Sequence, residues 1–281
     1  MQSYDEIMLK NYVELISDQN KSENEIQEFL ENNSELIPLE FLRGHHLHFN
    51  TIISKFPLGR KYITDFAYLT KDSVGWTLVL VEIETAKKKI FKNSANSYPQ
   101  FTADFNSARS QVSAWKSYVS KEKENVLSSV KAFKKPLVDN DVDFKYLLII
   151  GRDENFTVEQ MERLKSEEGD SLKILTYDSL LRRIEHRKAR KKLMVSIKGD
   201  DKYKIKKLPQ ELSSSIFAYV TNEELVISMD QKKELIRQGY DIDKWSEGHQ
   251  LSINDKYSSI PDKLRAENES NETLIKIFEN F

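Results

Sequence analysis

Residues 76–84, which read WTLVLVEIE, constrain the fold of this chain more than any other segment. The run is rich in leucine and valine, as expected of a central strand that is buried on both faces of a sheet. Side chains two apart on a strand point the same way, so Glu82 and Glu84 share one face while Val81 and Ile83 occupy the other. The segment therefore predicts a strand in the interior of a sheet that ends in two acidic side chains.

A second strand with an embedded acid is predicted immediately before it. Residues 62–69 alternate in the manner of a strand, with Asp65 in the middle, and residues 71–75 form a plausible hairpin turn between the two runs. Pairing as a hairpin would bring Asp65 near the face that carries Glu82 and Glu84. The cross-strand partner of Asp65 depends on the register, which the sequence does not fix.

Three carboxylates that converge in this way would repel one another. A hard cation such as Mg²⁺, or Mn²⁺, relieves the repulsion and takes carboxylate, water and phosphate oxygens as ligands. The alternative is that Asp65 is a strand-end acid and that Glu82 and Glu84 lie on a wetted face. The apolar flanks favour the metal site, because an unpaired acid on a buried strand is costly. We predict that Asp65, Glu82 and Glu84 are metal ligands.

The remaining pattern predicts an α/β fold, with a mixed sheet flanked by helices. Ser22 and Glu25 form a capping box that starts a helix over residues 22–31. Other helices are expected over residues 1–19, 101–121, 158–165 and 179–192, and other strands over residues 46–54, 144–150 and 172–176.

The last third of the chain reads differently. Short strands are expected at 217–220 and 225–228, a helix at 231–238, a polar stretch at 252–267 and a docking helix at 275–281. The sequence predicts an N-terminal helix in residues 1–21, a main domain in residues 22–195, and a small C-terminal α+β extension in residues 196–281 that serves assembly.

Bulk composition excludes several classes of protein. The 281 residues include no cysteine, so disulfides and thiolate metal sites are impossible. The net charge of −2 gives no support for nucleic-acid binding, although a local basic patch would suffice. No apolar run approaches a membrane span and no signal segment is evident, so we expect a cytoplasmic protein without membrane contact.

Basic side chains form two clusters. Lys87, Lys88, Lys89 and Lys92 follow the acidic strand directly and are well placed to hold DNA near a metal. The second cluster lies on the predicted 179–192 helix. These side chains either contact phosphate groups or simply belong to a solvated helix end, and the sequence leaves both interpretations open. The members of this second cluster are Arg182, Arg183, Arg187, Lys188, Arg190, Lys191 and Lys192.

Histidine and tryptophan give weaker signals. His45, His46 and His48 resemble a zinc cluster at first sight, but His45 would face away from the other two on a strand, so a metal role is disfavoured. The three tryptophans, Trp76, Trp115 and Trp245, are expected to be core anchors.

The ordered set of motifs resembles the Shedu anti-phage defence family, a branch of the PD-(D/E)xK nucleases. The matching features are the capped helix from Glu25 to Asn33, Asp65 in a strand, residues 81–83 (VEI), and a helix that carries Ala108, Gln111, Trp115 and Tyr118. The likeness covers about residues 22–185. It implies a restriction-endonuclease-like sheet with a divalent metal, DNA as substrate, and a homo-oligomer, a dimer or tetramer, that acts in phage defence.

The chain departs from the family pattern at one position. The family usually shows E-x-K, and this chain has Glu84 where that lysine would be. The lysine helps to position the attacking water and to stabilise developing charge. Three readings stay open: Glu84 is the general base, as in some E-x-E restriction enzymes; Lys87 or Lys88 reaches back; or the site is degenerate and binds without cutting. Gln111 is expected to hydrogen-bond a phosphate or the metal-bound water, and the alternative is an ordinary glutamine on the surface of a helix.

The sequence thus predicts a divalent-metal-dependent DNA endonuclease in anti-phage defence, with Asp65, Glu82, Glu84, Gln111, Lys87 and Lys88 as its catalytic set. The alternative is a catalytically degenerate protein of the same fold that binds DNA or a protein partner.

Overall fold

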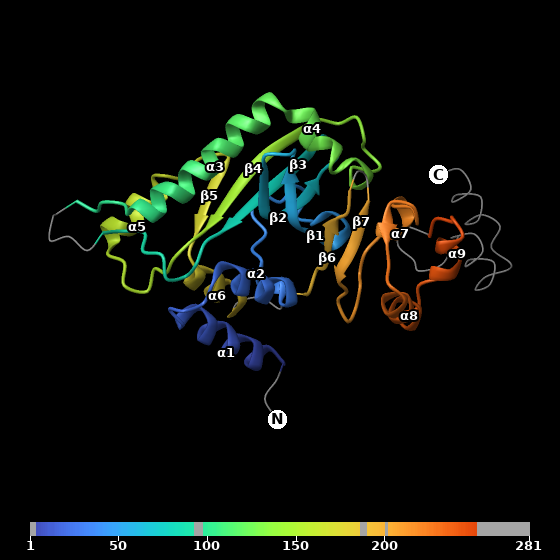
Figure 1. The fold of residues 1–281 in the computed structure, drawn as a ribbon, viewed down its shortest axis with the longest axis horizontal. Helices are drawn as coiled ribbons and strands as arrows, with labels where there is room; N and C mark the ends of the chain where they lie inside the picture. The colour runs from blue at the N-terminus through green and yellow to red at the C-terminus, as the bar shows by residue number, and fades with distance from the viewer. Residues whose placement is uncertain (1–3, 93–97, 186–189, 200–201, 252–281) are drawn as a thin grey trace.

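The computed structural model describes residues 4–92, 98–185, 190–199 and 202–251. The described strands form one mixed sheet in the order β5-β4-β3-β2-β1-β6-β7-β8 (Figure 1). The strands are β1 (Thr51–Leu58), β2 (Tyr62–Lys71), β3 (Trp76–Ile83), β4 (Val142–Ile149), β5 (Leu172–Leu175), β6 (Leu193–Ile197), β7 (Tyr203–Lys207) and β8 (Leu225–Val226).

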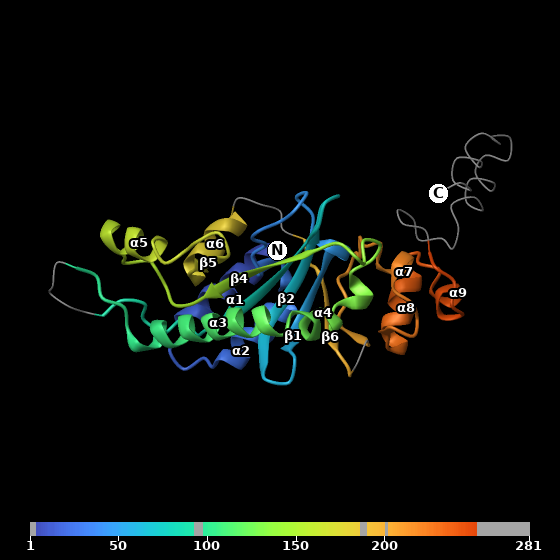
Figure 2. The same cartoon turned by 90° about the horizontal axis from the view of Figure 1, so that it is seen from above.

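Helices cover both faces of the sheet. Figure 1 shows α3 above it and α1, α2 and α6 below it, and Figure 2 shows α7, α8 and α9 gathered at the end of the molecule away from α5. The α-helices are α1 (Tyr4–Ser17), α2 (Glu23–Asn32), α3 (Ala103–Lys121), α4 (Lys123–Ser128), α5 (Val158–Lys165), α6 (Tyr177–Glu185), α7 (Ile216–Tyr219), α8 (Met229–Arg237) and α9 (Ile242–Ser246). Short 3₁₀ turns are η1 (Ser34–Leu36), η2 (His48–Asn50) and η3 (Lys131–Phe133).

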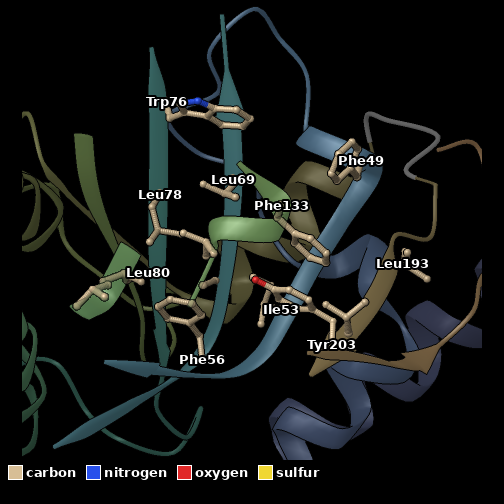
Figure 3. Packing of buried hydrophobic residues seen from close by; sticks show 14 of the residues in the cluster. Phe49, Ile53, Phe56, Leu69, Trp76, Leu78, Leu80, Phe133, Leu193 and Tyr203 are labelled. Carbon is tan, nitrogen blue, oxygen red and sulfur yellow. The ribbon is translucent and has the colours of Figure 1, made fainter. Parts of the chain in front are cut away.

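Successive side chains of the central strands point to opposite faces of the sheet, so the hydrophobic core is divided into two clusters. On β3, Leu78 and Leu80 pack with α3 in the larger cluster, part of which is seen in Figure 3, while Val79 and Val81 pack with α1, α2 and α6. All eight residues of β3 are buried. The predicted central strand and the predicted α/β class, a mixed sheet flanked by helices, are therefore confirmed.

Several local predictions are also confirmed. Ser22 and Glu25 form both hydrogen bonds of a capping box at the start of α2. Helix α5 occupies the predicted residues, and α3 falls within the predicted range. Trp76, Trp115 and Trp245 are buried, as expected of core anchors.

Three predicted boundaries or types are wrong. The strand expected at 46–54 begins only at Thr51, because residues 48–50 form η2 with positive φ angles at Phe49 and Asn50. Residues 217–220, expected to be a strand, lie mostly in helix α7, which packs Ile216 and Phe217 into the core. The helix expected to reach Lys192 ends its described part at Glu185, and residues 190–192 are not helical.

The C-terminal strands continue the main sheet. β6 pairs in parallel with β1, β7 pairs antiparallel with β6, and β8 pairs in parallel with β7. The predicted division at residue 195 thus falls inside β6. The segments predicted at 252–267 and 275–281 lie outside the described residues. Among the described helices, none has the length and apolar character that a membrane crossing requires.

Candidate metal centre

The β2–β3 hairpin brings the predicted acids onto one face of the sheet. Phe66 pairs with Val81 in the antiparallel register, which sets Asp65 opposite Glu82. Oδ2 of Asp65 accepts a hydrogen bond from the backbone N–H of Ile83 at 2.9 Å. Asp65, Glu82 and Glu84 are only 4%, 5% and 6% exposed. Because they alternate in step with the residues that pack on α3, all three carboxylates lie on the α3 face.

Each of the three acids forms a hydrogen bond or an ion pair with a side chain from a different part of the chain. Gln111, on α3, donates its Nε2 to Oε1 of Glu82. Lys88, which follows β3, pairs with Glu84. Lys55, in β1, places its Nζ 2.7 Å from Oδ1 of Asp65. Of the two lysines predicted to reach back, the structure brings Lys88 to the acids and leaves Lys87 exposed.

Lys55 is a site residue that sequence reasoning missed. It lies within β1 at a φ of +50°, a left-handed backbone that non-glycine residues rarely adopt. Such strain costs on the order of 1–3 kcal/mol and is often found where a side chain must be aimed at a functional site. The residue types around Lys55 are not those that favour a left-handed backbone, so the sequence does not predict this conformation.

Glu23 is the second missed residue. It lies in the first turn of α2 and is near enough to Asp65 and Glu84 for their charges to act on it. The sequence contains a pattern that points to this helix face: Glu23, Gln27 and Glu31 are spaced four residues apart, so their side chains share one face of α2. Glu25, by contrast, faces solvent and is occupied by Lys21 and the Ser22 cap.

Burial and mutual repulsion dominate the electrostatics. Burial, followed by the charges of Asp65, Glu84 and Glu23, raises the pKa of Glu82 far above its usual range, and a hydrogen bond with Asp65 adds to the shift. Burial and the same two carboxylates, Asp65 and Glu84, also raise the pKa of Glu23, while Lys55 and Lys88 oppose the rise. The site therefore carries more negative charge than its surroundings stabilise.

The charge balance fits a divalent cation. Four carboxylates, those of Glu23, Asp65, Glu82 and Glu84, face the two ammonium groups of Lys55 and Lys88, which leaves two negative charges when all groups are ionised. Oxygen donors are the ligands that Mg²⁺ and Mn²⁺ prefer. In the part of the chain that the structure describes, no three acidic or histidine side chains already stand in metal-binding geometry. Binding would therefore require carboxylates to turn away from their lysine and glutamine partners.

Two buried tyrosines hold the end of β3 beneath the acids. Tyr177, on α6, donates its hydroxyl to the backbone carbonyl of Glu84 at 2.5 Å. Tyr12, on α1, donates in turn to the carbonyl of Tyr177 at 2.8 Å. Both side chains are fully buried, so α1 and α6 fix the backbone that presents Glu84.

The predicted DNA-binding cations fall into two groups. Lys87, Lys89 and Lys92 are exposed in the segment that follows β3. Arg182 and Arg183 instead pair with Asp153 and Glu40, and Arg187 lies outside the described residues. Of the cations placed on the same predicted helix, Lys192 is buried and donates to the carbonyls of Ser34, Glu35 and Ile37.

Within the histidine-rich segment, His48 packs against the core, whereas His45 and His46 are exposed. His48 lies edge-on to Trp76 and hydrogen-bonds the carbonyl of Phe133 at 2.8 Å. Burial lowers the pKa of His48 to about 3, so its ring is neutral at physiological pH.

Comparison with known proteins places this site in a family. A family model described as "Shedu protein SduA, C-terminal" matches residues 20–181, which is more than half of the chain. The chain belongs to the Shedu family. The Shedu match spans α2, both strands of the acidic hairpin and α3, and it confirms the resemblance seen in the sequence. No curated protein matches the chain.

Proposed function

We propose that this chain is a divalent-metal-dependent DNA endonuclease with a PD-(D/E)xK core. Membership of the Shedu family implies a role in defence against phage. The observation that carries the enzymatic proposal is the meeting of Asp65, Glu82 and Glu84 at the end of a buried hairpin, where burial and then the neighbouring carboxylates raise the pKa of Glu82. Perturbed carboxyl groups of this kind are typical of functional sites.

Asp65, Glu82 and Glu84 would hold Mg²⁺ or Mn²⁺, with Glu23 close by. When bound, the ion would supply Lewis-acid stabilisation of the scissile phosphate and an acidified water. The side chains of the chain have separate tasks. Gln111, already on Glu82, would orient the water or a phosphate oxygen, and Tyr177 keeps the backbone of Glu84 in place.

Lys55 and Lys88 would take the role of the lysine that the E-x-E sequence lacks. Lys55 is 2.7 Å from Asp65 and its side chain is 44% exposed, so it contacts both the acids and approaching substrate. A cation there would stabilise the negative charge that develops on the phosphate during cleavage. Glu84 remains available as the general base once Lys88 turns to the substrate.

Lys87, Lys89 and Lys92 would bind the DNA backbone beside the metal. Their exposure makes them accessible to phosphates, and such contacts weaken as salt increases. Arg182 and Arg183 are poorer candidates because each is already engaged by a carboxylate. A homo-oligomer, dimer or tetramer, completes the proposal, with residues 196–281 serving assembly.

A plasmid-nicking assay with Mg²⁺ or with EDTA tests the proposal directly. We expect supercoiled plasmid to be cut only with Mg²⁺, and the Asp65→Asn and Glu82→Gln variants to be inactive while their circular dichroism spectra match the wild type. Cleavage that persists in either variant would contradict the assignment of these acids.

A second candidate function is DNA or protein binding without cleavage. Two observations favour it: Glu84 replaces the usual lysine, and the acids are already paired with Lys55, Lys88 and Gln111. A Mg²⁺ or Mn²⁺ titration distinguishes the two, because the degenerate protein would bind neither ion.

A further inference from the structure

A polar cleft adjoins the acidic site and shares Lys55 with it. Its volume is about 970 Å³, and it lies between the β1–β2 turn and the helices α3 and α4. Lys55 lines the cleft while its ammonium group contacts Asp65, so the cleft and the acids are joined through one side chain. The other principal lining groups are Gly59, Arg60, Tyr118, Asn125 and Ser128.

Gly59 fixes the shape of this cleft. Its φ of +57° is left-handed, and a Cβ at this position would lie 2.1 Å from the hydroxyl oxygen of Tyr118. The turn therefore packs directly against α3, because Gly59 has no side chain to separate them. Tyr118 also meets Tyr62 edge-to-face at 5.6 Å, which holds its ring at the cleft.

The charge and chemistry of the cleft fit a ligand that carries several phosphate groups and aromatic bases. Lys55 and Arg60 supply two cations, and Arg60 is exposed and forms no ion pair with any residue that the structure describes. The one carboxylate in the lining, that of Glu122, accepts a hydrogen bond from Asn125 at 2.5 Å. Cations that follow a phosphate backbone beside an aromatic ring are the usual means of binding unpaired nucleic acid.

We infer that this cleft binds the unpaired nucleotides that flank the cleavage position on the substrate strand. The inference rests on the proposed nuclease function, and it adds the path that the strand follows beyond the acids. A volume at the upper end of the roughly 300–1,000 Å³ range of small-molecule sites accepts a few nucleotides of single strand and is too small to enclose a duplex. Lys55 would contact the phosphate at the junction, and Arg60 a phosphate further along.

The test measures binding of a fluorescein-labelled oligothymidylate and of a hairpin duplex to the full chain in EDTA, so that it does not depend on cleavage. Ser128→Glu places a negative charge in the cleft and should weaken oligothymidylate binding by about tenfold or more, because it repels the phosphates. Its matched control is Ser120→Glu, an exposed position outside the cleft lining, which should bind as the wild type does. Arg60→Ala should lower the salt slope for the single strand by about 0.7, whereas Lys61→Ala, exposed but not in the lining, should leave it unchanged.

Each outcome decides the question. Equal single-strand affinity for Ser128→Glu and wild type would overturn the inference, as would an equal loss for Ser120→Glu. A loss of duplex binding as large as the loss of oligothymidylate binding would refute the assignment to an unpaired strand. A separate cleavage assay in Mg²⁺ distinguishes the two proposals: cleft-dependent binding without cleavage in wild type would reject the nuclease and keep the cleft, and normal binding and cleavage by the cleft variants would reject the cleft alone.

Discussion

Two groups of acids lie near the ends of the neighbouring parallel strands β3 and β4, and their charges are balanced to different extents. Beyond β4, the buried Asp153 accepts two hydrogen bonds from Arg182 at 2.6 and 3.0 Å, and the buried Asp178, on α6, accepts from Arg152 at 3.0 and 3.1 Å. Arg152 also pairs with the exposed Glu154 at 2.8 Å, so each buried acid there has its own arginine. At the end of β3, three buried carboxylates and the half-buried Glu23 of α2 face two lysines.

The pKa values follow this difference. Burial opposes ionisation of Asp153, but the hydrogen bonds and charge of Arg182 outweigh it and lower the pKa. Burial and neighbouring carboxylates instead raise the pKa of Glu82. Burial of an acid therefore does not by itself mark a functional site. The surplus of negative charge at the end of β3 is what supports the proposed metal site there.

The largest expected effect is on cleavage. Glu82→Gln and Asp65→Asn should each lower the rate of Mg²⁺-dependent plasmid cleavage by about 10³-fold or more, since each removes a ligand and a charge that the metal needs. Asp153→Asn is the matched control, an amide replacement at the arginine-paired acid, and should retain cleavage within a few-fold. Similar losses in all three variants would remove the functional distinction between the two groups.

Replacing a cation from each group should separate activity from stability. Lys55→Met should lower the cleavage rate by about 10²-fold through lost stabilisation of the phosphate charge, and should also lower the unfolding midpoint because the buried Asp65 loses its cation. Arg182→Met should lower the midpoint alone and leave cleavage intact. Initial rates and thermal unfolding of both variants provide the measurement, and an active Lys55→Met enzyme would show that Lys88 alone suffices.

The stability of the metal-free protein should respond to pH through Glu82. Because its folded pKa lies above its unfolded value of about 4.3, its contribution is fully present below that value and is lost as pH rises towards the folded pKa. Glu82→Gln lacks this loss, so it should be the more stable protein by about 2 kcal/mol near pH 8 and lose that advantage near pH 4. Urea unfolding in EDTA measures the difference. If the variant is less stable than the wild type at both pH values, the pKa of Glu82 is not raised in the folded protein.

The smallest effect is expected at the arginine-paired group. Arg182→Met should cost about 1–2 kcal/mol near pH 7, less than a fully buried pair, because Arg182 is 53% exposed and water screens it. The pKa of Asp153 is lowered in the folded state, so its stabilisation is present above the unfolded value of about 3.9 and disappears as pH falls through the folded value. The stabilities of variant and wild type should therefore converge as pH falls below the folded pKa of Asp153, and a constant gap would point to lost packing instead.

Local patterns predicted the centre of the sheet well. The apolar run of β3 and the alternation of β2 fixed both strands, and the period of two placed Glu82 and Glu84 on one face. The Ser22 capping box fixed the start of α2. These features depend on residues close in sequence, which is why a single sequence reveals them.

Features that depend on distant contacts were missed. Lys55, which reaches Asp65, has a left-handed backbone in mid-strand, and α7 packs Ile216 and Phe217 into a core that distant parts of the chain complete. The parallel pairing of β6 with β1 joins segments more than 130 residues apart, which no local pattern records. The sequence did show the Glu23–Gln27–Glu31 face of α2, and reading it would have predicted Glu23.

The most direct test of the unbalanced acidic site is a Mn²⁺ titration of the metal-free protein, followed by the electron paramagnetic resonance signal of free Mn²⁺. The wild type and Asp153→Asn are predicted to bind the ion with the same affinity, and Glu82→Gln at least about tenfold more weakly, since it lacks one carboxylate ligand. Equal binding by Glu82→Gln and wild type, or no binding by the wild type, would contradict the account.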